Sequence, residues 1–245
     1  MIAAVSCVFN EEHIIASTMA HLFAQGIEHI WVMDWYSTDA TPMILAETEN
    51  VTVVPPCQAE FFWEGHGDYQ MMLANEAGRA GAEWIIPFDA DEYWTGSEGR
   101  TIQQALPEVQ SNRVQAQIIQ YVDFDHKQLR PFPWTKVAFK WRRGLRMAPG
   151  NHMIWPDGEN GADREALLVH ELKFLSREHF IRKCRRKVRW SPTQFAMPSR
   201  DTIGLHVTED QWIAAQSSDE ELAFYWDWLN AEVETTPIPS AFRPV

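Results

Sequence analysis

Apolar runs and segments of helical spacing alternate along the first part of the chain. Four apolar runs predict strands, at residues 2–9, 29–33, 51–54 and 84–88. The segments between them carry apolar side chains at helical spacing and predict helices over residues 11–25, 42–47 and 69–80. Because crossovers between parallel strands are right-handed, this order predicts an α/β fold with a mainly parallel sheet flanked by helices on both faces.

The alternation is less regular in the rest of the chain. Further strands are predicted at residues 113–124, 134–142 and 167–174. A basic helix is predicted over residues 176–190, with Ser176 as its N-cap and Glu178 in its first turn, and a Trp-rich helix over residues 212–229. The length of 245 residues suits one sizeable α/β domain, since two independent domains would each have a thin core.

Charge is unevenly distributed along the chain. The net charge is −13, yet residues 136–189 carry 14 Lys or Arg against 6 Asp or Glu. Such a protein could hold a metal ion at its acidic part and an anionic substrate at its basic part, although a solvated basic helix explains the same pattern. The overall acidity disfavours nonspecific nucleic-acid binding, so we expect no nucleic-acid partner.

The sequence carries no pattern typical of a membrane span or a disulfide framework. No window approaches the roughly 18 to 20 apolar residues of a transmembrane helix, and two acids precede any signal-like stretch. We therefore expect a cytoplasmic protein without a transmembrane segment. Cys7, Cys57 and Cys184 lie far apart and lack the spacing of a zinc site, which predicts buried or idle thiols.

Three acids follow the fourth predicted strand: Asp89, Asp91 and Glu92. Carboxylates this close repel one another, and each would have a raised pKa unless a cation were present. In an extended chain Asp89 and Asp91 point to the same side, so both could reach one ion, and oxygen ligands favour Mn²⁺ or Mg²⁺. A solvated acidic turn is the alternative, although the ends of parallel strands are where ligands bind.

Polar motifs follow three of the predicted strands. Asn10-Glu11-Glu12 comes after the first, Asp34 with Ser37-Thr38-Asp39-Ala40-Thr41 after the second, and Asp89-Ala90-Asp91-Glu92 after the fourth. In order and spacing, these motifs resemble those of family 2 glycosyltransferases of the GT-A fold, over about residues 1–95. Three ordered motifs are more specific than a lone DxD, which is common by chance.

The resemblance implies one glycosyltransferase domain over residues 1–245. Its nucleotide-sugar-binding half would span residues 1–95, and an acceptor-side half with C-terminal helices would span residues 96–245. The donor would be a UDP- or GDP-linked sugar, and the acceptor a glycan or a small molecule. A divalent metal, Mn²⁺ or Mg²⁺, would bridge the diphosphate of the donor and neutralise the charge that develops on the leaving group.

The same resemblance assigns roles to single residues. The loop of Asn10, Glu11 and Glu12 would bracket the base and ribose together with Asp34, and Asp39 would help to fix that loop. Asp89 would face the ribose and the metal, and Asp91 would bind the metal directly. Helix capping and turn formation also explain the acids and the amide after the first two strands.

The chain departs from the family pattern at two places. Trp35-Tyr36 stands between the second-strand acid and its Ser-Thr-Asp, where family members usually have small polar residues. Inverting members usually supply a carboxylate base on the acceptor side, and the sequence leaves several candidates for this role: Asp123, Asp125, Asp157 and Glu159.

The second half supplies histidines and basic side chains. His152 and His170, with the basic helix, resemble the back half of a branch of the same superfamily, in which a late His completes the metal shell. Either His could instead deprotonate an acceptor hydroxyl or be a structural residue. Among the basic residues, Arg143 and Arg146 are the preferred candidates to bind the diphosphate, with a surface role as the alternative. Trp63 and Trp155 could stack on a sugar.

These expectations combine into one functional prediction. The chain is expected to be a metal-dependent glycosyltransferase, a hexosyl- or related transferase, that moves a sugar from a nucleotide sugar to an acceptor hydroxyl, inverting by the usual outcome in the family it resembles. The predicted catalytic candidates are Asp123, Asp157 and His152, and the predicted metal ligands are Asp89, Asp91 and His170. A nucleotidyltransferase and a non-catalytic nucleotide-sugar-binding module are the alternatives.

Overall fold

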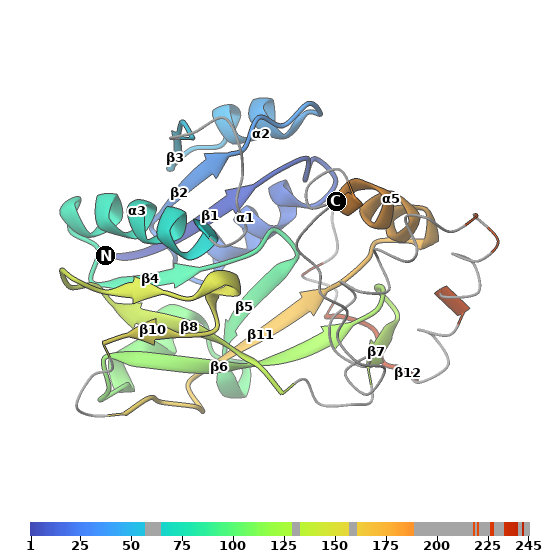
Figure 1. Ribbon diagram of the computed structural model, residues 1–245. Coiled ribbons are helices and arrows are strands. Elements are labelled where there is room, and N and C mark those ends of the chain that lie inside the picture. Colours follow the sequence, from blue (N-terminus) through green and yellow to red (C-terminus); the bar gives the residue numbers. More distant parts are fainter. Residues whose placement is uncertain are drawn as a thin grey trace. The chain divides into compact units, whose positions relative to one another are not determined.

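The structure is a computed structural model, which describes most of the chain up to residue 188 and parts of the rest (Figure 1). The described residues are 1–56, 65–128, 133–156, 161–188, 218, 220, 226–227, 233–239 and 242, with only the backbone of 128, 183–188 and 234. The chain packs as two compact units. Unit 1 comprises residues 1–118, 134–171 and 241–245, and unit 2 comprises residues 119–133 and 172–240.

Unit 1 begins with a parallel sheet. Its four strands are β1 (Ile2–Val8), β2 (His29–Asp34), β3 (Val51–Val54) and β4 (Trp84–Pro87). They pair in the order β4-β1-β2-β3, and all three pairings are parallel. The apolar side chains of β1, β2 and β4 are almost fully buried, as expected for strands covered on both faces. The sequence prediction of these strands is confirmed to within one or two residues.

Helices cover this sheet on both faces. The helices are α1 (Ile15–Ala24), α2 (Thr41–Glu47) and α3 (His66–Arg79). In Figure 1, α3 lies in front of β1 and β4 and α1 lies behind them. Right-handed crossovers require this arrangement, because the chain leaves β1 toward β2 and β3 but enters β4 on the opposite side of β1. The predicted α/β fold class is confirmed.

Antiparallel strands extend the sheet of unit 1. β8 (Thr135–Lys140) pairs with β4, and β6 (Arg113–Tyr121) pairs with β8. β5 (Glu92–Gly96) pairs with β11 (Leu167–Leu172), which also joins β6. β5 was not predicted from the sequence, whereas β6, β8 and β11 were, each ending two or three residues earlier than predicted. The prediction of a mainly parallel sheet thus holds for the first half of the fold.

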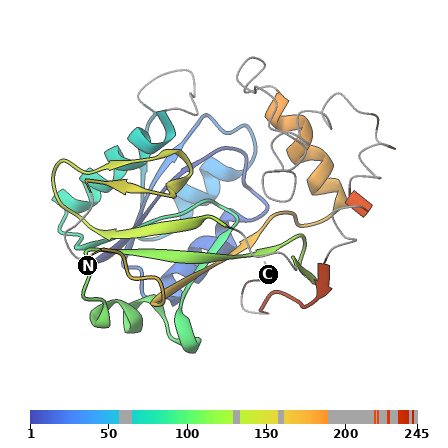
Figure 2. The same cartoon turned by 60° about the horizontal axis from the view of Figure 1, so that its bottom comes forward.

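Short elements complete unit 1. A hairpin is formed by β9 (Arg146–Met147) and β10 (Ile154–Trp155), with the 3-10 turn η4 (Pro149–Asn151) between them. Figure 2 shows this hairpin, in yellow, beside β8 and α3, both of which contact it or its turn. The other elements follow β5: η2 (Ser97–Gly99), α4 (Ile102–Ala105) and η3 (Leu106–Glu108). A capping box of Thr101 and Gln104 starts α4.

Unit 2 has its own small core. Val122, Phe174 and Phe180 are buried together, and Trp226 and Val233 pack against them. The strands β7 (His126–Gln128) and β12 (Val233–Thr235) pair antiparallel, and the helix α5 (Arg177–Val188) supplies Phe180.

The start of α5 agrees with the sequence prediction. The N–H of His179 donates to Oγ of Ser176 over 3.2 Å, so Ser176 is the predicted N-cap. Most of the predicted Trp-rich helix over residues 212–229 lies outside the described residues. Within the part of the chain that the structure describes, no helix has the length and apolar character needed to cross a membrane.

Candidate functional site

The carboxyl ends of β1 and β4 form the switch point of the parallel sheet. From β1 the chain runs to β2 and β3 on one side, and then enters β4 on the other side. At such a point the loops leaving the two strands diverge and open a crevice where ligands bind. Asn10 follows β1, Asp89 follows β4, and Asp34 ends β2 opposite Val8. These predicted site residues therefore share one edge of the sheet.

The loops after β1 and β2 are tied together at this edge. The N–H of Asn10 donates to Oγ of Ser37 over 2.8 Å, and the N–H of Thr38 donates to Oδ1 of Asn10 over 2.7 Å. Asn10 has a φ of 53°, a left-handed conformation that Asn adopts more readily than most residues. Asp34 accepts from Oγ of Ser37 over 2.5 Å and from its N–H over 3.3 Å. The carboxylate of Asp34 thus closes a turn at the carboxyl edge of the sheet.

The start of α2 belongs to the same network. The N–H of Glu11 donates to Oγ1 of Thr41, and the N–H of Glu12 donates to Oδ2 of Asp39. In return, the N–H of Ala40 donates to Oε2 of Glu12. Burial acts to raise the pKa of Asp39, but its hydrogen bonds with Thr41 and Glu12 hold that pKa below its ordinary value. The acids of these loops therefore fix the conformation of both loops through hydrogen bonds to the backbone.

Trp35 and Tyr36, which depart from the family pattern, have different environments. Trp35 is buried, and its ring packs on that of Tyr69 with centroids 4.7 Å apart. Tyr36 is 56% exposed and has a φ of 57°. The first aromatic residue is therefore part of the core, and the second is presented to solvent next to the Asp34 turn.

The acids after β4 form a turn around a buried lysine. The Nζ of Lys136 lies 2.7 Å from Oδ2 of Asp89 and 2.7 Å from Oε1 of Glu92. The N–H of Glu92 donates to the carbonyl of Asp89 over 3.0 Å, and Oε2 of Glu92 accepts from the N–H of Asp89 over 3.1 Å. The extended conformation predicted for Asp89 to Asp91 is therefore wrong, because the Glu92 carboxylate folds back to close a turn.

The charges of this cluster are balanced by Lys136. Burial acts to raise the pKa of Asp89, but Lys136 and His66 outweigh burial and hold it below its ordinary value. Burial likewise acts to lower the pKa of Lys136, and nearby carboxylates raise it above its ordinary value. For Glu92, which is fully buried, burial prevails and raises its pKa. Lys136 supplies the cation that the acid cluster requires, and Glu92 is the acid that most readily holds a proton.

The predicted metal ligands are not gathered into one set. Among the described residues, which include Asp89, Asp91 and His170, no three His, Cys, Asp or Glu side chains form a group that could hold a metal ion. On β11, His170 pairs with Tyr93 and packs its ring 5.1 Å from that of Phe242. The carboxylate of its neighbour Glu171 is one of those that raise the pKa of Lys136. Because neighbours on a strand face opposite ways, His170 faces away from the Lys136 cluster.

Two histidines complete the surroundings of Asp89. His66 is buried at the first turn of α3, and its Nδ1 accepts a hydrogen bond from the N–H of Gly150 over 3.4 Å. Burial lowers the pKa of His66 to about 4, so its ring is neutral near pH 7. The Nδ1 of His152 lies 2.9 Å from the carbonyl oxygen of Thr135. Both rings lower the pKa of Asp89 when they are protonated, so His152 lies near Asp89 in the structure.

Gly67 brings the hairpin that carries His152 close to α3. A Cβ added at Gly67 would lie 2.1 Å from the carbonyl oxygen of Met147 in β9. Only Gly permits this approach of helix and strand backbones. The contact fixes η4 beside His66, and so helps to position His152.

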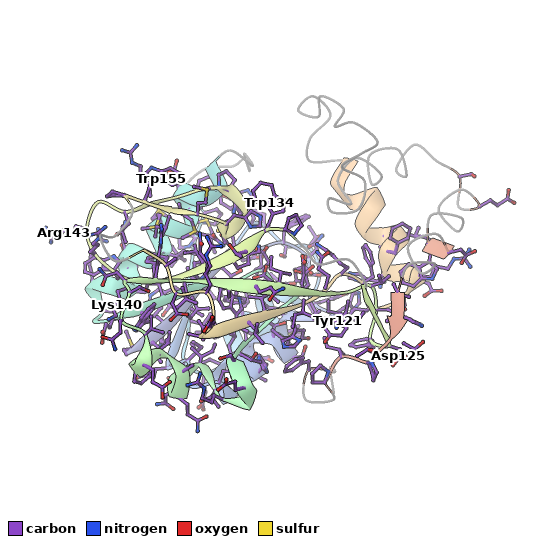
Figure 3. All side chains as sticks on the ribbon, turned by 90° about the horizontal axis from the view of Figure 1, so that it is seen from below. Tyr121, Asp125, Trp134, Lys140, Arg143 and Trp155 are labelled. Atoms are coloured by element: carbon purple, nitrogen blue, oxygen red, sulfur yellow. The ribbon has the colours of Figure 1, made fainter. Side chains whose placement is uncertain are left out.

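The predicted diphosphate-binding arginines, Arg143 and Arg146, lie between β8 and β9 and at the start of β9. Antiparallel β8 runs from Lys136, next to Asp89, to Lys140, which pairs with Trp84 at the start of β4. Four residues of strand separate these ends by roughly 13 Å. Figure 3 shows Arg143 near Lys140, at the opposite end of β8 from Trp134. Arg146 is an exposed residue of β9, paired with Trp155. The structure thus does not bring Arg143 beside Asp89.

Other predicted residues lie in unit 2 or outside the described chain. In unit 2, the carboxylate of Asp123 contacts Nδ1 of His126 at 2.7 Å and accepts from the N–H of Asp125 over 2.9 Å. These bonds close the turn between β6 and β7. Several other candidates lie outside the described residues: Cys57, Trp63, Asp157 and Glu159. The side chains of Lys183 and Cys184 also lie outside them.

Comparisons with known proteins gave matches only among solved structures. No family model matches the chain, and no curated protein matches it. TarS 1–349 from S. aureus in complex with UDP is 14% identical with a TM-score of 0.47, and the match covers 94% of this chain and 83% of that chain. The crystal structure of TarS 1–349 described without UDP gives 14% identity and a TM-score of 0.45, covering 93% and 82%.

A further match has a lower score. HddC from Yersinia pseudotuberculosis is 12% identical with a TM-score of 0.34, over 70% of this chain and 77% of that chain. The identities and TM-scores of all these matches are low, so the function proposed for this chain rests on its own residues.

Proposed function

We propose that this chain is a glycosyltransferase that transfers a sugar from a nucleotide-sugar donor to an acceptor hydroxyl. The observation that carries the proposal is the position of Asp89, at the switch point of the sheet, held by the buried Lys136 and close to His66 and His152. A donor in the crevice would contact the loops after β1 and β2 with its base and ribose. Its diphosphate and sugar would then lie toward Asp89, which follows the neighbouring strand β4.

The donor set of this site fits a divalent ion that arrives with the nucleotide. Lys136 already balances the charge of Asp89, and burial favours the protonated form of Glu92, which leaves Asp91 as the carboxylate to bind Mn²⁺ or Mg²⁺. Mg²⁺ is usually held by one or two carboxylates together with substrate phosphates and waters, so a complete protein cage is not required. A bound ion would neutralise charge on the departing nucleoside diphosphate.

His152 is the proposed base of the transfer step. A carbonyl oxygen can only accept, so its contact with Thr135 places the proton of the neutral ring on Nδ1 and the lone pair on Nε2. In the proposed step the acceptor oxygen forms a bond to the anomeric carbon while its proton passes to Nε2. The bond from that carbon to the phosphate oxygen breaks, and its electron pair leaves with the nucleoside diphosphate. One such displacement inverts the anomeric centre.

A panel of nucleotide sugars with Mn²⁺ tests the proposal. The expected result is release of free nucleoside diphosphate from one UDP- or GDP-linked sugar, measured by coupled assay, and weaker release in EDTA. Release of pyrophosphate from a nucleoside triphosphate and a sugar phosphate would favour a nucleotidyltransferase instead. Tight binding of nucleotide sugars without any turnover would identify a binding module and contradict the proposal.

A further inference from the structure

Trp134 is an unusually exposed tryptophan. The buried tryptophans of unit 1 are at most 7% exposed, at positions 31, 35, 84 and 94, whereas Trp134 is 48% exposed. Leaving half of an indole in water forgoes a large part of the hydrophobic gain of burying it. A half-exposed aromatic face beside a polar cluster is a common feature of ligand sites, where one face is apolar and the rim is polar.

Trp134 lies directly beside the proposed base. Its ring centroid is 5.6 Å from that of His152, and the planes are tilted by 40°. The next residue, Thr135, provides the carbonyl that orients His152, and Lys136 reaches Asp89. Three consecutive residues at the start of β8 therefore have different roles. Trp134 presents the exposed ring, Thr135 sets the tautomer of His152, and Lys136 is the cation beside Asp89.

The sheet order separates Trp134 from the loops proposed for the nucleotide. The strands run β8-β4-β1-β2, so Trp134 lies on one side of Asp89 and the loops after β1 and β2 lie on the other. Two strand spacings, roughly 10 Å, separate β8 from β1. A ligand on Trp134 is therefore on the side of the cluster opposite the base and ribose, with the transfer position between them.

We infer that Trp134 forms the aromatic wall of an acceptor subsite, on which a pyranose ring of a carbohydrate acceptor stacks with a hydroxyl directed to Nε2 of His152. This inference rests on the proposed glycosyl transfer. A pyranose has one face of C–H groups, which suits the exposed indole, and a rim of hydroxyls, which suits the polar side chains next to it. The chemical class of the acceptor is thus a glycoside rather than a flexible lipid or a protein side chain.

Trp134→Ala, Trp134→Phe and Trp155→Ala test this subsite in the full chain. Trp155 is a matched control because it is 36% exposed but belongs to β10, where it pairs with Arg146, on the Arg143 side of Trp134 (Figure 3). The probes are 4-nitrophenyl glycosides of the common hexoses, with binding measured by saturation-transfer NMR. Trp134→Ala should weaken glycoside binding about tenfold, as loss of an aromatic contact predicts, while Trp134→Phe retains most of it and Trp155→Ala changes it less than about twofold.

A second readout separates this inference from the proposed function. Release of nucleoside diphosphate without an acceptor tests donor chemistry alone, and Trp134→Ala should leave the KM for the donor unchanged. Normal release with unchanged glycoside binding in both Trp134 variants would overturn the subsite and leave the proposed function standing. A raised donor KM in Trp134→Ala would overturn it too, by assigning the indole to the nucleotide. Loss of glycoside binding in a protein that releases no nucleotide would support the subsite and contradict glycosyl transfer.

Discussion

The ammonium of Lys136 lies 2.7 Å from a carboxylate oxygen of Asp89, and the lysine side chain is only 5% exposed. A buried lysine is stable as a cation only if carboxylates face it, and those carboxylates are in turn stable as anions only if it stays charged. The pair therefore links the stability of the fold to the position of Asp89. It also explains how an acid cluster can persist at the end of a buried strand before any ligand binds.

Lys136→Met should destabilise the protein strongly. Removing the cation leaves Asp89 and Glu92 without their shared partner, and breaking a buried pair costs about 3–5 kcal/mol. We expect about 3 kcal/mol, since Asp89 is 35% exposed and water screens part of the loss. Urea unfolding measures this. Lys140→Met is the control on the same strand and should cost less than about 1 kcal/mol. Equal stability of the two variants would contradict the electrostatic role.

The pH dependence of stability should carry a signature of Glu92. Its pKa is raised from 4.5 to about 8 in the folded chain, so the unfolded chain loses the proton first as pH rises. The free energy of unfolding should therefore fall between about pH 4.5 and about pH 8 because of this group. Glu92→Gln has no such proton, and the difference between the two unfolding curves should reach at least about 1 kcal/mol over this range.

The control for this comparison is a glutamate whose side chain is exposed to solvent. Glu108 is 74% exposed, and Glu108→Gln should leave the slope of unfolding free energy against pH unchanged. The slope is the quantity to compare, because a Gln amide also removes one acceptor from the turn. A Glu92→Gln curve parallel to that of the wild type would show that Glu92 is ionised throughout.

The pattern of apolar and polar residues within each segment was sufficient to predict the strands and the sheet edge that position the site. Each strand of the parallel sheet is a short apolar run bounded by polar residues. The runs of β1, β2 and β4 are largely buried, whereas β3 at the edge of the sheet is partly exposed. Because parallel strands end at one edge, the positions of Asn10, Asp34 and Asp89 at that edge followed from the order of elements alone. Ser176 as N-cap of α5 is a similarly local feature and was predicted from its own segment.

Contacts between distant segments were not predictable in this way. Lys136 reaches Asp89 because β8 pairs antiparallel with β4, with Lys140 opposite Trp84, and this register is absent from local periodicity. A lysine within the apolar run of β8 was the one sequence signal, since a buried lysine requires an acid nearby. His66 depends on a similar long-range contact, through Gly150. The face of β11 that His170 occupies was likewise not predictable, because its strand partner decides it.

Asn10 offers a test of the paired loops at the crevice. Asn10→Ala removes the acceptor of the Thr38 N–H and places an alanine at a φ of 53°, which together should cost about 2 kcal/mol. Asn10→Gly loses the same hydrogen bond but tolerates the backbone conformation, so it should be the less destabilised variant. Thermal unfolding with and without UDP or GDP measures both effects. If alanine were better tolerated than glycine, the left-handed conformation would not be a constraint here.

Asp91→Ala tests the metal proposed for the transfer step. Asp91 lies in the turn after β4 and is only partly buried, so its loss should change the thermal midpoint less than the loss of the buried Lys136. Turnover with Mn²⁺ should fall at least about hundredfold, because loss of charge stabilisation on the leaving group is worth several kcal/mol. Glu83→Ala removes an exposed acid just before the same strand and should keep full activity. If Asp91→Ala turned over as fast as Glu83→Ala, with an equal response to EDTA, Asp91 would not be a metal ligand, and the cation at this site would be Lys136 alone.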